Sequence, residues 1–96
     1  MTVFFTSSAT KDLENINSYL SQHWGHNSQL KFESKLRHSL NLLPSNPRLG
    51  ILENVAKNIY SILVHKHIRV YYRLTLKKII ILSLFDVRQN PNLRPT

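Results

Sequence analysis

The stretch that decides the fold is His67-Ile-Arg-Val-Tyr-Tyr-Arg-Leu74, followed by Lys77-Lys-Ile-Ile-Ile-Leu-Ser-Leu-Phe-Asp-Val-Arg-Gln-Asn-Pro91. Its β-branched and aromatic residues predict two adjacent strands. Side chains alternate along an extended chain, so the apolar positions of the first strand should face a core, namely Ile68, Val70, Tyr72 and Leu74. The other face would carry His67, Arg69, Tyr71 and Arg73. Such a basic and aromatic surface suits the binding of a polyanion or an acidic protein.

The residues before this stretch predict one strand and two helices. Residues 2–6 are short, aromatic and β-branched, which is typical of a strand, and Ser7-Ser8 suits the capped start of a helix. An apolar stripe at helical spacing follows, made of Leu13, Ile16, Leu20 and Trp24. Gly25 should end this helix. A second helix is expected from Asn27 or Ser28 to the residue before Pro44.

Together these elements predict an α+β fold with the order β-α-α-β-β-β. The link at Gly25 is short, so the helices should form an antiparallel hairpin. Three strands are expected at 59–64, 68–74 and 79–87, joined by turns short enough for antiparallel hairpins. The apolar run 79–82 indicates a strand buried on both faces, although a buried helical segment would also fit. We expect a helical hairpin packed on a small antiparallel sheet, in a single domain over 1–96 with an irregular C-terminal tail.

The charge of the chain is strongly basic and unevenly placed. Its 96 residues carry 13 Lys and Arg against five Asp and Glu, a formal net charge of +8. Most of the excess lies in residues 51–96, which hold eight basic and two acidic residues. A field of this sign attracts nucleic acid, acidic proteins or anionic membrane without choosing among them, and a merely solvated basic surface is the plain alternative.

Several classes of chemistry are excluded by composition. The chain has no cysteine, which excludes disulfides, thiol nucleophiles and cysteine metal sites. It shows no Gly-rich phosphate loop, paired carboxylates or metal-ligand spacing, so we expect no cofactor and no metal. Neither a signal peptide nor an apolar run long enough to span a membrane is visible, and we expect a cytoplasmic protein with no membrane partner.

Five side chains remain as candidates for function. His65 and His67 flank a predicted turn and, if extended, would project to the same side as possible proton carriers or metal ligands, although turn histidines are commonly just solvated. Arg69 and Arg73 lie inside a strand and are either binding residues or ordinary cations on a wet face. Arg88 closes the last strand beside Asp86, as a binding group or as an exposed ion pair.

Six segments, taken in order, resemble one known family over nearly the whole chain. They are Ser8-Ala-Thr-Lys-Asp-Leu-Glu-Asn-Ile-Asn-Ser-Tyr19, Phe32-Glu-Ser-Lys-Leu36, Leu43-Pro-Ser-Asn-Pro-Arg-Leu-Gly50, Ile68-Arg-Val-Tyr-Tyr-Arg73, Ile79-Ile-Ile-Leu82 and Phe85-Asp-Val-Arg-Gln-Asn-Pro91. Their order and spacing resemble the RelE/ParE superfamily of toxins from bacterial type II toxin-antitoxin modules. The resemblance implies a strand, two helices and a three-stranded antiparallel meander. It also implies a cognate antitoxin whose acidic or amphipathic segment wraps the toxin, with a possible hetero-oligomer.

The resemblance also bears on mechanism. In RNA-cleaving relatives, arginines matching Arg69 and Arg88 contribute to the site, with lysines on the preceding strand and an aromatic residue or His near the C-terminus. Here the preceding strand reads Tyr60-Ser-Ile-Leu-Val64, without lysine, and no Tyr or His follows Arg88. A ParE-like mode, in which DNA gyrase is poisoned by protein contact, requires no such catalytic set.

These observations lead to one expected function and two alternatives. We expect a ParE-like toxin that acts on DNA gyrase, with Arg69, Tyr71, Arg73 and Arg88 as binding residues. The first alternative is a RelE-like, ribosome-dependent mRNA endoribonuclease. In that case Arg69 and Arg88 would be catalytic, and His65 and His67 would be the nearby proton carriers. The second alternative is a basic nucleic-acid-binding domain.

Overall fold

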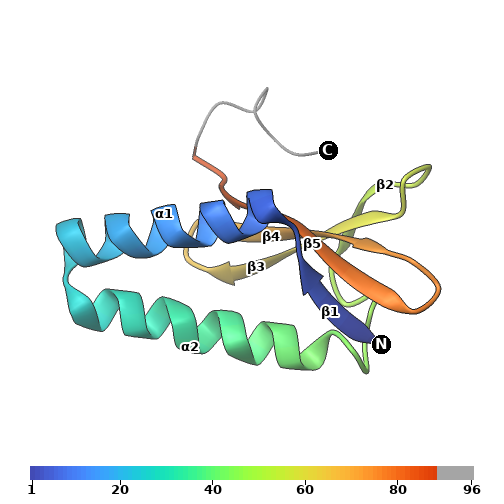
Figure 1. Ribbon diagram of the computed structural model, residues 1–96, viewed down its shortest axis with the longest axis horizontal. Helices are drawn as coiled ribbons and strands as arrows, with labels where there is room; N and C mark the ends of the chain where they lie inside the picture. The colour runs from blue at the N-terminus through green and yellow to red at the C-terminus, as the bar shows by residue number, and fades with distance from the viewer. Residues whose placement is uncertain (89–96) are drawn as a thin grey trace.

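The computed structural model describes residues 1–88, which form two helices and a five-stranded sheet (Figure 1). The elements in chain order are β1 (Thr2–Phe5), α1 (Ser7–Trp24), α2 (His26–Leu42), β2 (Ile51–Asn54), β3 (Ile59–His65), β4 (Ile68–Leu74) and β5 (Lys78–Asp86). The strands lie in the order β1-β5-β4-β3-β2. The predicted α+β fold, a helical hairpin packed on a small sheet, is confirmed. The predicted C-terminal tail falls mostly on residues 89–96, outside the described part.

The sheet contains more than the predicted meander. β3, β4 and β5 pair antiparallel, as expected. β1 pairs with β5 in parallel, so the sheet as a whole is mixed. A further strand, β2, pairs antiparallel with β3 and was not predicted, because four residues of Ile-Leu-Glu-Asn are too short to show an alternating pattern. The result is a sheet in which β4 is central and β1 and β2 are the two edges.

The helix ends differ by one or two residues from the prediction. Thr6, rather than either serine after it, caps α1, because its Oγ1 accepts a hydrogen bond from the backbone N–H of Ala9 at 3.0 Å. Gly25 ends α1 with a φ of 89°, a left-handed value that favours glycine. The same glycine begins α2, so neither Asn27 nor Ser28 serves as its cap. Ser28 Oγ instead donates to a carbonyl at the end of α1.

The helical hairpin covers one face of the sheet and forms the main core there. The alternation predicted for β4 is confirmed on this face, where Val70 and Tyr72 are fully buried. Phe32 from α2 packs into the same cluster. Asp12 fastens α1 to β5, because its Oδ2 accepts hydrogen bonds from Ser83 Oγ at 2.9 Å and from a backbone N–H at 3.1 Å. The helices are thereby held at one distance and angle from the strands.

The sheet face away from the helices is less exposed to solvent than predicted. Tyr71 lies there beside the strand arginines, yet it has no exposed surface and packs with Ile59 and Phe85 in a second small cluster. Its ring meets that of Phe85 edge-on, with centroids 6.4 Å apart. β4 is the central strand, so a large side chain on it is covered by cross-strand neighbours on both sides. The ring of Tyr71 is therefore not available for stacking against a ligand.

A close backbone approach fixes the loop that enters β2. A Cβ at Gly50 would collide with the backbone carbonyl of Ser61, so the position requires glycine. The hydroxyl of Tyr72 accepts from the Gly50 N–H at 3.1 Å and donates to the Pro47 carbonyl at 2.9 Å. These bonds tie the loop to the buried side of the sheet. Within residues 1–88, neither helix is both long and apolar enough to cross a membrane.

Candidate functional site

The helical hairpin projects past the turn between β3 and β4 (Figure 1). Side chains of α1, of this turn and of the end of β5 line a groove of about 590 Å³. We call it the aromatic groove. One wall is α1, which contributes among others Ile16, Tyr19, Leu20 and Trp24. The other wall is the β3–β4 turn and the end of β5, which contribute His65, Lys66, His67, Asp86 and Arg88. The groove thus joins an apolar helix face to a basic rim.

The apolar stripe predicted on α1 packs against the core at Leu13, Ile16 and Leu20, but its last member does not. Trp24 is 66% exposed and Tyr19 is 50% exposed. The ring of Tyr19 lies tilted against that of His23, with centroids 4.4 Å apart and an interplanar angle of 36°. Helical spacing marks which residues share a face, but only the reach of the sheet decides whether that face is covered. Here α1 extends past the sheet, so its last apolar residues form a groove wall.

His65 is the most deeply buried ionisable group of the groove. It is 7% exposed, its ring lies 6.2 Å from that of Phe32 between centroids, and its Nδ1 has no hydrogen-bond partner among residues 1–88. Burial lowers the pKa of His65, and three nearby lysines lower it further, namely Lys35, Lys66 and Lys31. The imidazole is therefore neutral at pH 7, with one ring nitrogen able to accept a proton or a hydrogen bond.

The two histidines at the β3–β4 turn do not have the extended geometry that was assumed for them. Lys66, between them, has a φ of 44°, so the chain reverses there instead of alternating. As a result His65 is buried and His67 is exposed. Both still line the aromatic groove. The same-side projection expected of an extended chain therefore does not apply here.

Arg88 is engaged by the acid that precedes it. Its Nη2 lies 2.7 Å from Asp86 Oδ2 and its Nε lies 3.1 Å from Oδ1, a bidentate ion pair. The hydrogen bond from Arg88 lowers the pKa of Asp86 and in turn raises the pKa of Arg88. This is the ion pair that the sequence allowed as one interpretation. Arg88 therefore keeps its positive charge at the groove rim, where Asp86 balances part of it.

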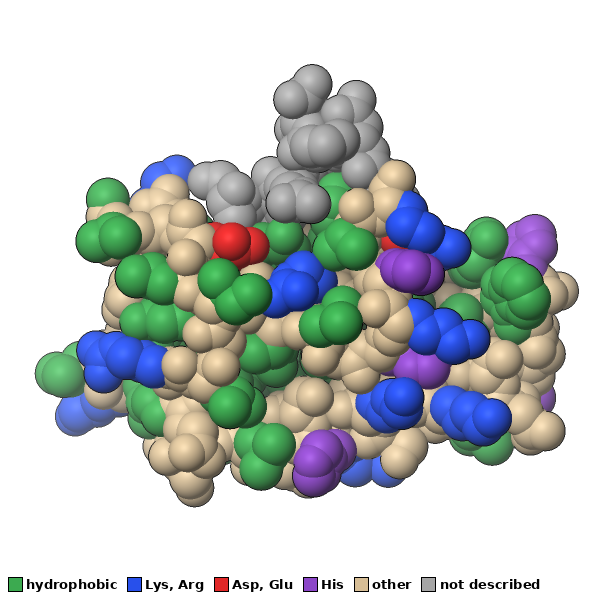
Figure 2. Space-filling model, turned by 180° about the vertical axis from the view of Figure 1, so that it is seen from behind, with side chains coloured by type: hydrophobic (Ala, Val, Ile, Leu, Met, Phe, Trp, Pro, Cys, Tyr) green, Lys and Arg blue, Asp and Glu red, His purple; other side chains and the backbone are tan. Residues whose placement is uncertain are grey.

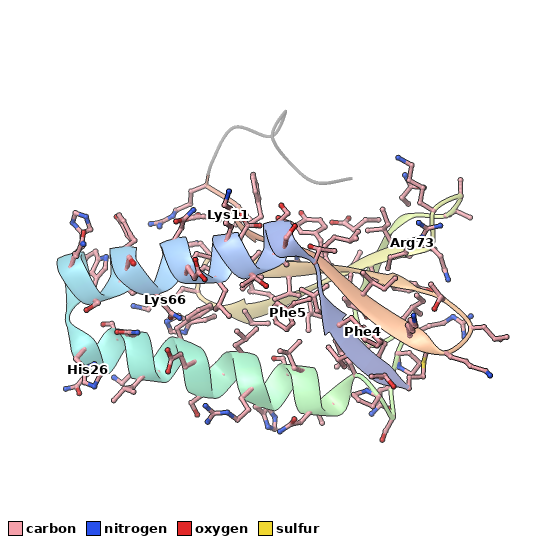
Figure 3. All side chains as sticks on the ribbon, in the orientation of Figure 1. Phe4, Phe5, Lys11, His26, Lys66 and Arg73 are labelled. Carbon is pink, nitrogen blue, oxygen red and sulfur yellow. The ribbon has the colours of Figure 1, made fainter. Side chains whose placement is uncertain are left out.

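The strand arginines lie outside the groove, on the sheet face away from the helices. Arg69 Nε donates to the buried Ser61 Oγ at 3.1 Å, and that hydroxyl donates to Glu53 Oε2 at 3.0 Å. Arg73 is exposed near the far end of β4 (Figure 3). Figure 2 shows this face, with many basic and few acidic side chains. The structure therefore separates Arg69 and Arg73 from the groove that holds Arg88 and the two histidines.

Sequence reasoning missed the α1 wall and the lysines around His65. Trp24 was placed on the apolar stripe of α1, but the spacing of such a stripe does not show whether it is covered, and Tyr19 was not singled out. Lys31 and Lys35 are one helical turn apart on α2, a spacing that placed them on one face but not beside a strand residue. Within residues 1–88, no three His, Asp or Glu side chains come together to hold a metal ion.

The comparisons with known proteins agree with this geometry. The family described as the ParE toxin of the type II toxin-antitoxin system, parDE, matches residues 3–91. Among solved structures, the chromosomal ParDE toxin-antitoxin system from P. aeruginosa aligns with a TM-score of 0.76 and 21% identity, covering 91% of this chain and 96% of that one. The YoeB dimer from Staphylococcus aureus aligns with a TM-score of 0.61 and 20% identity, over 86% and 92% of the two chains. The comparison with curated proteins gave no match.

A helical hairpin on a mixed five-stranded sheet is also the fold of the solved ParDE and YoeB structures. This chain belongs to the ParE toxin family of type II toxin-antitoxin systems. The E. coli DinJ–YafQ complex also aligns, with a TM-score of 0.59 and 18% identity over 88% of this chain and 90% of that one. The fold is therefore shared by ParE and by YoeB and YafQ, and it does not by itself distinguish their targets.

Proposed function

We propose that this toxin inhibits DNA gyrase by protein contact and that a cognate antitoxin neutralises it. The observation that carries the proposal is the separation of the charged groups that RNA cleavage would need. Metal-free cleavage of a phosphodiester requires a base, an acid and cations that converge on one reacting phosphate. In this chain those groups lie in two places, on the outer sheet face and in the aromatic groove.

Three of the four candidate catalytic groups are also bonded to another side chain or buried. Arg69 is bonded to Ser61 on the outer face. Arg88 is paired with Asp86, so part of its positive charge is already balanced and is less able to stabilise a phosphate. His65 is neutral and almost completely buried, which leaves His67 as the exposed proton carrier of the groove. An inhibitor that acts by contact needs a shaped surface and not a converging acid and base.

The aromatic groove is the site that we assign to the antitoxin. Its α1 wall exposes large apolar side chains, which are the residue types that dominate binding energy at interfaces. Its rim carries Lys66, His67 and Arg88, which suit an acidic or amphipathic segment. The structural relatives include DinJ with YafQ and YoeB with YefM, which are toxin-antitoxin complexes. By analogy with them, the antitoxin would cover a toxin surface that is otherwise exposed.

The test compares two targets with one preparation of purified protein. We expect it to inhibit gyrase supercoiling or to raise gyrase-dependent DNA breaks, while mRNA on translating ribosomes stays intact. Added cognate antitoxin should reverse the inhibition. If the protein leaves gyrase unaffected and cuts mRNA at codon positions, the proposal is wrong.

A ribosome-dependent endoribonuclease is the second candidate, because the aromatic groove does bring His65, His67 and Arg88 together. In that case the groove would contain a relocated acid-base pair. Codon-positioned cuts that vanish in His65→Ala, His67→Ala or Arg88→Ala, but persist in the exposed control His38→Ala on α2, would support this candidate.

A further inference from the structure

The end of the sheet opposite the aromatic groove carries a second basic surface. Two turns lie there, at 55–58 between β2 and β3 and at 75–77 between β4 and β5 (Figure 1). We call this surface the hairpin end and define it by Val55, Lys57, Arg73, Leu76, Lys77 and Lys78. All six side chains are exposed. Figure 2 shows basic side chains at this end around a projecting apolar one.

The cations of the hairpin end lack acidic partners. Within residues 1–88, the ion pair of Arg88 with Asp86 is the only one, so none of Lys57, Arg73, Lys77 and Lys78 is neutralised by a carboxylate. The acidic residue adjoining the first turn, Glu53, accepts a hydrogen bond from Ser61 on the sheet face. Four cations without a carboxylate partner at one end of the sheet attract a polyanion.

The two turns are held in fixed positions by hydrogen bonds. Asn58 has a left-handed φ of 57°, and its Nδ2 donates to the Leu74 carbonyl at 3.0 Å, while the Leu74 N–H donates to the Asn58 carbonyl at 3.1 Å. In the second turn, Thr75 exchanges hydrogen bonds with Lys78, including one of 3.0 Å from the Lys78 N–H to Thr75 Oγ1. Lys78 Nζ also lies 5.0 Å from the centre of the Phe4 ring. A surface ordered in advance loses little conformational entropy on binding.

Each turn also projects an apolar side chain beyond its cations. Leu76 is 92% exposed and Val55 is 79% exposed. The turns are separated by two strand spacings, about 10 Å, which is close to the width of the major groove of B-DNA, about 12 Å. Two side chains of this size would bury fewer methylene groups than one myristoyl chain, which alone gives only marginal membrane binding. The geometry thus favours a nucleic acid over a lipid surface.

We infer that the hairpin end binds the phosphate backbone of duplex DNA. Lys57, Lys77, Lys78 and Arg73 would contact phosphates on the two sides of a groove, and Leu76 would lie between them against the sugar and base edges. The inference goes beyond gyrase inhibition and does not depend on it, because binding to bare DNA is measured without gyrase. The surface also lies apart from the aromatic groove, so a toxin held by its antitoxin could still bind DNA here.

The test measures binding of the purified full chain to a fluorescent 20-base-pair duplex by anisotropy at several salt concentrations. The hairpin-end variant is Lys57→Ala, Lys77→Ala and Lys78→Ala. Its matched control is Lys11→Ala, Lys31→Ala and Lys35→Ala, which removes the same charge from exposed helix positions. Loss of three phosphate contacts should weaken binding about tenfold or more and should lower the slope of log K against log salt by about 2 to 3. The control should change both quantities much less.

Leu76→Ser separates the apolar contact from the charges, and we expect weaker binding with an unchanged salt slope. Thermal unfolding of each variant verifies that these exposed substitutions leave the fold intact. Equal losses in the hairpin-end variant and its control would show a diffuse charge effect and would overturn the inference. It would equally be overturned if the wild-type protein bound phosphatidylserine vesicles but not the duplex.

Discussion

The aromatic groove and the hairpin end are built from the same kinds of residue, cations and exposed apolar side chains, but they present them in opposite ways. The groove is concave, its apolar side chains form a continuous helix wall, and its arginine is paired with Asp86. The hairpin end is convex, its apolar side chains stand singly, and its cations have no acidic partner within residues 1–88. Binding in the groove should therefore depend on buried apolar area, and binding at the hairpin end should depend on charge and on salt.

The largest effect is expected from the α1 wall of the groove. Tyr19→Ala together with Trp24→Ala should weaken binding of the antitoxin about 100-fold or more, because buried aromatic anchors contribute about 2 kcal/mol or more each. Folding should change little, since both side chains are at least half exposed. Isothermal titration calorimetry at two salt concentrations measures both the loss and its salt dependence.

Leu30→Ala is the matched control for this double variant. Leu30 is an apolar residue on α2 that is 46% exposed and does not line the groove. If this control weakens antitoxin binding as much as the groove variant does, or if the loss of affinity in the groove variant disappears in high salt, binding in the groove does not depend on its apolar wall.

The next effect concerns the outer sheet face that runs between the two ends. Arg69→Ala together with Arg73→Ala should reduce growth inhibition more than it reduces the free energy of unfolding. Arg69 loses one hydrogen bond to Ser61, worth about 1 to 2 kcal/mol, and the exposed Arg73 should contribute less than about 0.5 kcal/mol. Urea unfolding and a growth assay measure the two quantities in parallel.

The opposite result would give these arginines a purely structural role. It would consist of a loss of several kcal/mol of stability while the correctly folded fraction kept full activity. Each single variant then shows which arginine is responsible.

The smallest effect is a dependence of stability on pH that belongs to the groove end alone. His65 has a lowered pKa in the folded protein, so between its folded and unfolded values the unfolded chain binds more protons. Its contribution is fully present above the unfolded value of 6.5 and is lost as the pH falls through the folded value. Asp86 also has a lowered pKa, and its contribution is lost in a separate window, below its unfolded value of 3.8.

Melting temperatures between pH 7.5 and 5.0 test this assignment. We expect His65→Asn to remove part of the decline that the wild-type protein shows, and we expect the exposed control His38→Asn to leave it unchanged. An identical decline in the wild type and in His65→Asn would mean that His65 does not cause it.

The local pattern of apolar residues was sufficient to predict a strand or helix wherever that pattern repeated over the whole element. β4 lies at the predicted residues 68–74. In a strand whose apolar and polar residues alternate, a shift of one residue would turn the apolar side chains away from the core, so the pattern defines the strand. The two helices were also predicted, and their ends were missed by a residue or two because the cap is chosen by a single hydrogen bond, here from Ala9 to Thr6. β2 was missed because four residues are too few to show an alternating pattern. This strand is defined by its pairing with β3.

The candidate site was predicted less well than the fold. The sequence picked out His65, His67 and Arg88, which the structure brings into one groove, and it grouped Tyr71 with Arg69 and Arg73 as one binding surface. Tyr71 proved to be buried, because the degree to which a strand position is covered depends on how many strands lie beside it. Strand order is set by pairings between distant segments, such as β1 with β5, that no local pattern contains.

The sequence by itself determined the α+β class, the positions of the main helices and strands, the inner face of β4, the excess of positive charge and the resemblance to the RelE/ParE superfamily. These properties follow from composition and from periods of 2 and 3.6 residues, which are local. Only the tertiary structure decided that Trp24 lines a groove, that Tyr71 is buried and that Lys57 and Lys77 share one end of the sheet. Exposure and hydrogen bonding depend on neighbours in space, and those neighbours are up to 76 residues apart in sequence, as between Thr6 and Leu82.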